Sequence, residues 1–151
     1  MSAQVTGTWE KSLPTAKVQA RENGGLLMVV ACNSVTCPYC KAAEAGVFSK
    51  SEWQEYSRSK GMPQYLADAA VYAPRKVFTV LTRDYHIVFW PTVLLFKLRP
   101  DAKLTTTALK NGVDVDLVGS FVFRKGRYVN GTKIASVTPA ALIQAVKSFK
   151  V

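Results

Sequence analysis

The chain has 151 residues, with 20 lysines and arginines against 10 aspartates and glutamates, and therefore a formal net charge of +10. Apolar residues make up 48% of the sequence, which predicts one packed globular domain over residues 1–151 and excludes a disordered or collagen-like chain. The longest apolar run, residues 26–32, is far shorter than the ~20 residues of a membrane-spanning helix. The polar start predicts no secretory signal, and the pattern is compatible with a cytoplasmic or a periplasmic protein.

The positive charge is concentrated in the second half of the chain. Residues 1–75 carry eight basic and six acidic side chains, a net charge of +2, whereas residues 76–151 carry twelve and four, a net charge of +8. Such a field favours acidic partners. The basic residues are not interleaved with aromatic ones as in nucleic-acid modules, so we expect a solvated face that favours an acidic protein surface and binds no nucleic acid.

The first half of the chain predicts a helix, a buried strand and a second helical region. A helix with Pro14 in its first turn ends at the Asn23-Gly24 pair. Residues 26–32 are apolar without alternation, which is typical of a strand covered on both faces. Residues 41–48 favour a helix that is interrupted near Gly46, and Ser51 is a candidate cap for its continuation.

The rest of the chain predicts strands and helices in alternation. The strands are expected at residues 64–70, 92–98 and 117–123, with a hairpin turn at Lys125-Gly126 and a return strand over residues 127–134. Helices are expected at residues 74–85 and after Thr138, which precedes a proline at the first helical position. The polar segment 99–116 is interpreted as an insertion or an extended turn. This order predicts an α/β sandwich.

The three cysteines, Cys32, Cys37 and Cys40, lie within nine residues. An odd and clustered set of cysteines indicates a local redox or metal site and not a structural disulfide framework. In Cys37-Pro38-Tyr39-Cys40 the first cysteine falls where a buried strand meets a helix N-terminus, so Cys37 is expected to ionise more readily than an ordinary thiol. The thiolate of Cys37 would attack a disulfide and Cys40 would resolve the intermediate, so the couple needs no further cofactor.

Three stretches, residues 26–31, 37–41 and 90–97, resemble the thioredoxin-like superfamily. The resemblance implies a three-layer sandwich whose mixed central sheet carries helices on both faces, with an additional N-terminal helix and the insertion 99–116. It also implies a cis bond before Pro91 and substrate pairing with that segment. The substrate-binding residues implied in this way are Pro38, Tyr39, Trp90, Pro91 and Thr92.

The chain departs from the family pattern at two positions beside the motif. Thr36 replaces the aromatic residue that often precedes the first cysteine, and Ala31 stands where thioredoxins have a buried carboxylate. The acid that would help to deprotonate Cys40 is therefore missing. Glu44, one helical turn after Cys40, or water would take this role, with Lys41 beside it, although a solvated Glu44–Lys41 pair is an alternative interpretation.

Cys32 and the single histidine, His86, leave alternatives open. Cys32 is expected to be a small buried hydrophobic residue, or else a regulatory third thiol or a metal ligand. Cys32, Cys37, Cys40 and His86 form a set that zinc accepts, but structural zinc sites usually contain two tight ligand pairs and this sequence has one. We therefore expect no metal.

The sequence predicts a thiol-disulfide oxidoreductase, most simply a monomeric reductase, in which Cys37 is exposed and Cys40 is buried. Its expected partners are proteins that contain disulfides and an upstream redox partner. The alternative is a binding module of the same fold that uses its basic second half and has non-catalytic cysteines. Trp9 and Trp53 are interpreted as packing residues, whereas Trp90, beside Pro91, is expected either to lie next to the thiols and contact substrate or to pack in the core.

Overall fold

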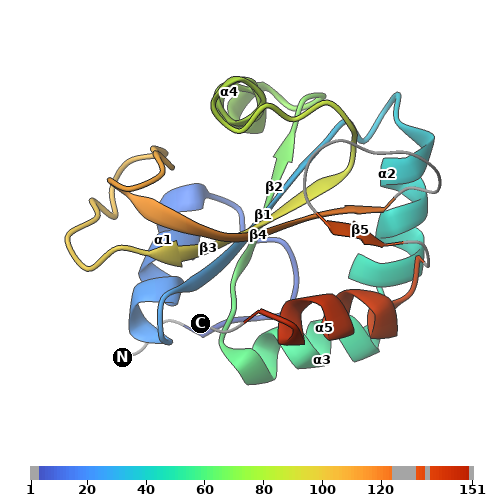
Figure 1. The fold of residues 1–151 in the computed structure, drawn as a ribbon, viewed down its shortest axis with the longest axis horizontal. Helices are drawn as coiled ribbons and strands as arrows, with labels where there is room; N and C mark the ends of the chain where they lie inside the picture. Colours follow the sequence, from blue (N-terminus) through green and yellow to red (C-terminus); the bar gives the residue numbers. More distant parts are fainter. Residues whose placement is uncertain (1–3, 124–131, 135–136, 150–151) are drawn as a thin grey trace.

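A computed structural model describes residues 4–123, 132–134 and 137–149, which form one five-stranded sheet with helices on both faces (Figure 1). The strand order is β2-β1-β3-β4-β5, and β1 pairs parallel with β2 and antiparallel with β3. The strands are β1 (Leu26–Cys32), β2 (Gln64–Asp68), β3 (Thr92–Leu98), β4 (Val115–Phe123) and β5 (Thr132–Ile134). The helices are α1 (Leu13–Glu22), α2 (Pro38–Ala43), η1 (Glu44–Phe48), α3 (Ser51–Lys60), α4 (Tyr72–Asp84) and α5 (Pro139–Lys147). The predicted α/β sandwich is confirmed.

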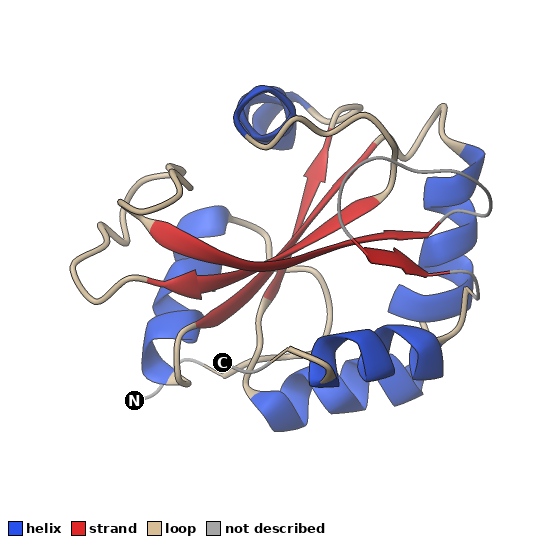
Figure 2. Ribbon diagram, viewed as in Figure 1, coloured by secondary structure: helices blue, strands red, loops and turns tan. Residues whose placement is uncertain are grey.

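The central strand β1 is buried along its whole length because helices cover both of its faces (Figure 2). Leu27 and Val29 belong to a cluster that includes residues of α1 and α4. Met28 and Val30 belong to a second cluster, formed with residues of η1, α3 and α5. Burial of each such side chain contributes about 1.5–3 kcal/mol, so the uninterrupted apolar run supports two cores at once.

Two helices begin as the sequence predicts, and one does not. The Ser12 hydroxyl accepts a hydrogen bond from the Thr15 N–H at the start of α1, and Thr138 accepts one from Ala141 at the start of α5. Ser51 does not cap α3: it is the first helical residue, and the cap position is Lys50, whose side chain makes no capping bond. A serine at the first helical position lies one residue past the cap position, and its hydroxyl is not placed to accept from the free N–H groups of the first turn.

The helix that follows the cysteines changes its winding near the predicted interruption. It runs as an α-helix to Ala43 and then as the π-helix η1, which contains Gly46. A Cβ atom at Gly46 would lie 2.9 Å from the Val137 carbonyl oxygen, so glycine allows the chain before α5 to approach closely. The wider turn places Val47 and Phe48 in the core.

The predicted hairpin after β4 is wrong. The structure pairs β5 with β4 in parallel, with Phe121 opposite Thr132 and Phe123 opposite Ile134, whereas a tight turn joins antiparallel strands. The Lys125-Gly126 pair and the first part of the predicted return strand lie outside the described residues. The local turn signal therefore did not determine which way the last strand runs.

The connection between β3 and β4, residues 99–116 in the sequence interpretation, is tied to the helix α1. The fully buried Lys17 ammonium donates hydrogen bonds to the Ala108 carbonyl oxygen at 2.7 Å and to the Lys103 carbonyl oxygen at 3.3 Å. Leu109 is buried in the same core as α1, and β4 begins earlier than expected, at Val115. Burial lowers the pKa of Lys17, while the charge of Asp114 acts in the opposite direction.

Candidate redox site

The loop between β1 and the cysteine motif is held by side-chain acceptors at both ends. The Asn33 side-chain oxygen accepts the N–H groups of Val35 and Thr36 at 3.1 Å each. Across the sheet, the buried Asp68 carboxylate accepts the Ser34 N–H at 3.0 Å and the Ala70 N–H at 2.9 Å. These bonds place Cys37 at the start of α2 with its side chain directed back along the helix.

Cys37 occupies the N-cap of α2, as the strand–motif–helix order predicts. Its sulfur accepts the Cys40 N–H at 3.2 Å, and its thiol donates to the Trp90 carbonyl oxygen at 3.6 Å. The Trp90–Pro91 peptide bond is cis. The motif and the proline segment, more than fifty residues apart in the chain, therefore meet at the Cys37 sulfur.

Two expectations for Cys37 are wrong. Its exposed fraction is 7%, close to the 6% of Cys40, so the first cysteine is nearly as buried as the second. Burial, with a smaller contribution from the Cys40 side chain, raises the pKa of the Cys37 thiol to about 11. The N–H groups of Cys40 and Tyr39 act in the opposite direction, but these helix N-terminal donors do not outweigh the loss of water around the sulfur.

A narrow hollow above the Cys37 sulfur connects it to the surface. This Cys37 groove, of about 260 Å³, is lined by Thr36, Cys37, Pro38, Tyr39, Val88, Phe89 and Trp90. Tyr39 is 48% exposed, Val88 62% and Trp90 37%, so large and partly exposed side chains surround the buried sulfur. Exposed apolar groups gathered in one place are typical of a surface that receives a partner.

The three remaining predicted substrate residues lie at different depths. Trp90 stands at the groove and its ring packs edge-on against Phe78, with centroids 5.3 Å apart. Pro91 is buried behind the groove. Thr92 is buried in β3, where its hydroxyl donates to the Phe89 carbonyl oxygen at 2.6 Å and so holds the proline segment. A role of Thr92 toward substrate stays a prediction.

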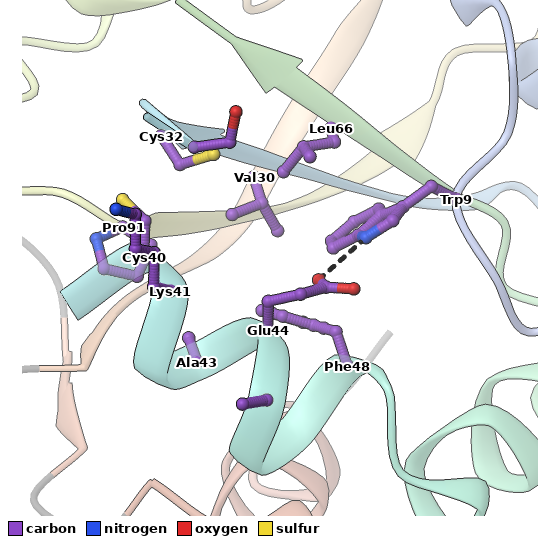
Figure 3. A pocket seen from close by; sticks show the side chains of 12 residues that line it. Trp9, Val30, Cys32, Cys40, Lys41, Ala43, Glu44, Phe48, Leu66 and Pro91 are labelled. Carbon is purple, nitrogen blue, oxygen red and sulfur yellow. Dashed lines mark hydrogen bonds between the residues drawn. The ribbon is translucent and has the colours of Figure 1, made fainter. Parts of the chain in front are cut away.

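A second, larger hollow lies beside Cys40 (Figure 3). This Cys40 pocket, of about 490 Å³, is lined by Trp9, Val30, Cys32, Ser34, Cys40, Lys41, Ala43, Glu44, Ala45, Phe48, Leu66 and Pro91. Cys37 is not among these residues, whereas Cys32 and Cys40 both are. The Cys32 side chain and then burial raise the pKa of the Cys40 thiol far above its ordinary value. Cys40 is thus protonated at neutral pH.

Glu44, one helical turn after Cys40, and Lys41, directly after it, line the same pocket as Cys40. The Glu44 carboxylate accepts the Trp9 indole N–H at 2.9 Å, and Trp9 packs on Phe48 with ring centroids 4.8 Å apart (Figure 3). Trp9 is therefore more than a packing residue, because it fixes the direction of the acid. Trp53 is fully buried and donates to Gln64, as a packing residue would.

The alternative zinc set, Cys32, Cys37, Cys40 and His86, is not brought together in one site. His86 is exposed and follows α4, and the three cysteines form a small cluster of their own. Within residues 4–123, 132–134 and 137–149, no group of three or more His, Cys, Asp or Glu side chains has a geometry that could hold a metal ion.

No helix in these ranges is long and apolar enough to cross a membrane. The basic residues Arg124, Lys125 and Arg127 lie outside the described residues.

Sequence reasoning missed Asp68, Val88 and Phe89. Asp68 is the last residue of β2 and faces the last residue of β1, Cys32, in the sheet register. A single acid at the carboxyl end of an otherwise apolar strand was the available signal, because such ends gather at one edge of a sheet. Val88 and Phe89 precede the proline segment and were visible only as part of a general apolar run.

Comparison with known proteins gives a consistent fold. No protein-family model matches the sequence, and no curated protein matches it. Among solved structures, the chain is similar to one described as "DsbH Oxidoreductase", with a TM-score of 0.61 and 14% identity over 97% of this chain and 85% of the other. It is also similar to a thioredoxin from Thermus thermophilus, with a TM-score of 0.57 and 16% identity over 98% and 87% of the two chains. The chain therefore has a thioredoxin-like fold.

Proposed function

We propose that the protein is a thiol-disulfide oxidoreductase that acts on protein disulfides through a Cys37/Cys40 couple. The observation that carries this proposal is the placement of Cys37. Its sulfur lies at the N-terminus of α2 and at the floor of an apolar groove, with Cys40 one turn behind it. The similar structures include one described as an oxidoreductase and one described as a thioredoxin, which agrees with this chemistry.

The reaction has two exchange steps. The Cys37 thiolate attacks one sulfur of the substrate disulfide, forms a mixed disulfide and releases the other substrate sulfur as a thiolate that takes a proton. The Cys40 thiolate then attacks the Cys37 sulfur, forms the Cys37–Cys40 disulfide and releases the second substrate thiol. Two electrons and two protons pass from the protein to the substrate, and an upstream dithiol partner restores the couple.

The groove supplies the substrate contacts in this proposal. Pro38, Tyr39 and Trp90 line its surface and would contact apolar side chains that flank the substrate disulfide. The backbone of the Pro91 segment would pair with the extended substrate chain, which gives affinity with little dependence on sequence. The Trp90 carbonyl, already 3.6 Å from the Cys37 sulfur, marks where that chain would pass.

Glu44 takes the proton of Cys40 in the second step. Both residues line the Cys40 pocket, and the Trp9 indole holds the carboxylate in place. A buried thiol with a strongly raised pKa needs a base to become a nucleophile, and a carboxylate linked through pocket water can serve as one. Lys41, exposed on the same pocket, would help to return that proton to solvent.

The thiol environment supports the reductive direction of this proposal. Strongly oxidising couples have a stabilised thiolate in the reduced form, whereas here burial keeps the Cys37 thiol protonated. The reduction potential is therefore expected near the thioredoxin value of roughly −270 mV and not near −120 mV. Equilibration with a glutathione buffer followed by thiol counting measures it.

Insulin reduction tests the proposal. Wild-type protein with dithiothreitol should accelerate precipitation of reduced insulin, and Cys37→Ser should abolish the acceleration while its near-UV spectrum stays native. Glu44→Gln should lower turnover by about 10²-fold near pH 7, the size of a general-base contribution, with recovery at higher pH. Glu52→Gln, an equal charge change at an exposed position of α3, is the matched control. Full activity of Cys37→Ser would refute the proposal.

A further inference from the structure

Cys32 is the one thiol that the proposed reaction does not use, although it belongs to the same cluster. Cys32, Cys37 and Cys40 are each buried, with exposed fractions of 4%, 7% and 6%. Cys32 ends β1 and Cys40 lies in the first turn of α2, so both are fixed by regular structure. Cys32 is therefore a third thiol held close to the redox couple.

Cys40 is the middle member of the three. The Cys40 N–H donates to the Cys37 sulfur at 3.2 Å, and the Cys32 side chain contributes most to the raised pKa of the Cys40 thiol. The two openings agree with this order: Cys37 lines the Cys37 groove, and Cys32 and Cys40 line the Cys40 pocket. The Cys40 sulfur can therefore be approached from the Cys37 side or from the Cys32 side.

The geometry points to a second disulfide, Cys32–Cys40, that forms by exchange from the Cys37–Cys40 disulfide. The inference rests on the proposed couple, since it starts from its oxidised form. The Cys32 thiolate attacks the Cys40 sulfur, the Cys32–Cys40 bond forms, the Cys37–Cys40 bond breaks, and Cys37 leaves as a thiolate. The proton that Cys32 loses is balanced by the one that Cys37 gains, so no oxidant or reductant is consumed.

The exchange moves the disulfide away from the Cys37 groove and leaves a free thiol there. In that state Cys37 can still form a mixed disulfide with a substrate or a small thiol, but Cys40 no longer stands ready to resolve it. The protein would then hold its partner instead of releasing it. Cys32 thereby gives the oxidised protein two forms, one that turns over and one that stores a reactive Cys37.

Variants that each lack one cysteine test the order of the three thiols. In Cys37→Ser only Cys32 and Cys40 remain, and treatment with diamide, which accepts two electrons and two protons, should remove both free thiols within one monomer. In Cys40→Ser only Cys32 and Cys37 remain, and both thiols should stay free under the same treatment. In Cys32→Ala/Cys37→Ser no intramolecular bond is available, which controls for other losses of thiol. Closure of Cys37→Ser no faster than of Cys40→Ser would overturn the inference.

The wild-type protein gives a second readout that needs no variant. All three cysteines fall on one tryptic peptide, residues 22–41, so alkylation of oxidised protein after acid quenching labels the single free cysteine and fragmentation locates it. A label on Cys37 reports the Cys32–Cys40 bond, and a label on Cys32 alone overturns the inference. Insulin reduction is scored separately, so active protein labelled only on Cys32 refutes this inference while the proposed function stands.

Discussion

The Cys37 groove and the Cys40 pocket share no lining residue and differ in chemistry. The groove is lined by apolar and aromatic side chains, with Cys37 as its titratable thiol beside Tyr39. The pocket contains two thiols, a carboxylate and an ammonium group. In the proposed reaction the groove receives the substrate and the pocket handles protons and the second thiol. The four predictions that follow test this division.

The largest effect is expected from removing the pocket thiol while the groove thiol is kept. Cys40→Ser should stop turnover and accumulate a covalent adduct between Cys37 and the substrate, because nothing remains to resolve the mixed disulfide. Gel electrophoresis without reductant, after incubation with oxidised protein substrates, measures the adduct. Cys37→Ser should form none, and an adduct on that variant at equal yield would show that both thiols are open to substrate.

A second large effect concerns the pH dependence of Cys37 itself. With its pKa raised to about 11, the thiolate fraction and the alkylation rate should rise about tenfold per pH unit, or about 10²-fold from pH 7 to pH 9. Iodoacetamide modification of the reduced protein, with the labelled residue located by mass spectrometry, measures this. A plateau below pH 8 would mean that the helix N-terminus outweighs burial at this sulfur.

The raised pKa of Cys37 has the opposite effect on folding stability, which decreases with rising pH while the alkylation rate increases. The raised pKa keeps the folded thiol neutral after the unfolded thiol has begun to ionise near pH 9, so the contribution of Cys37 to stability is intact below that pH. It decreases as the pH rises toward 11. Activity and stability should therefore change in opposite directions over the alkaline range.

A third effect separates docking from chemistry within the groove. Trp90→Ala should lower kcat/KM for a protein disulfide by about tenfold, equivalent to about 1.4 kcal/mol of lost apolar contact, and change the rate with a small aromatic disulfide much less. Steady-state assays with both substrates measure the ratio. Tyr72→Ala removes an aromatic residue that is 69% exposed and outside the groove, and should leave the ratio unchanged.

The sequence predicts the site where it depends on neighbours in the chain. The apolar run of β1, the motif and the helix after it place Cys37 at an N-cap, and a proline at the first helical position supports this start. The raised pKa of Cys37 depends mainly on burial, and the groove at its sulfur is completed by Phe89 and Trp90, about fifty residues away, which no local pattern encodes. The Trp9–Glu44 bond, 35 residues apart, is of the same kind.

The direction of β5 was missed for a related reason. A Lys-Gly pair favours a tight turn on local grounds, but the partner and direction of a strand are decided by the whole sheet. The start of α5 was predicted well because Thr138 caps the backbone there, and a cap is a contact within three residues. Local interactions are readable from the sequence, and the tertiary contacts that tune them are not.

The smallest effect is expected at Asp68, which supports the loop between the groove and the pocket. Asp68→Ala leaves the N–H groups of Ser34 and Ala70 without their acceptor and should cost about 1–3 kcal/mol of unfolding free energy, measured by urea denaturation. Because the loop leads into Cys37, the variant should also alkylate faster at fixed pH. Asp114→Ala is the control for the alkylation rate, since it removes a similarly buried acceptor, of the Lys110 N–H, far from the cysteines in the sequence.

The acid dependence of the same variant gives an independent check. Burial would raise the pKa of Asp68, but the hydrogen bonds from Ser34 and Ala70 more than offset it and hold the pKa below its ordinary value. The carboxylate therefore stabilises the fold above about pH 4, and this contribution disappears as the pH falls through the lowered pKa. Asp68→Ala should lose less stability than the wild type between pH 5 and pH 2. Equal losses of stability in the two proteins would mean that Asp68 does not support the cysteine loop.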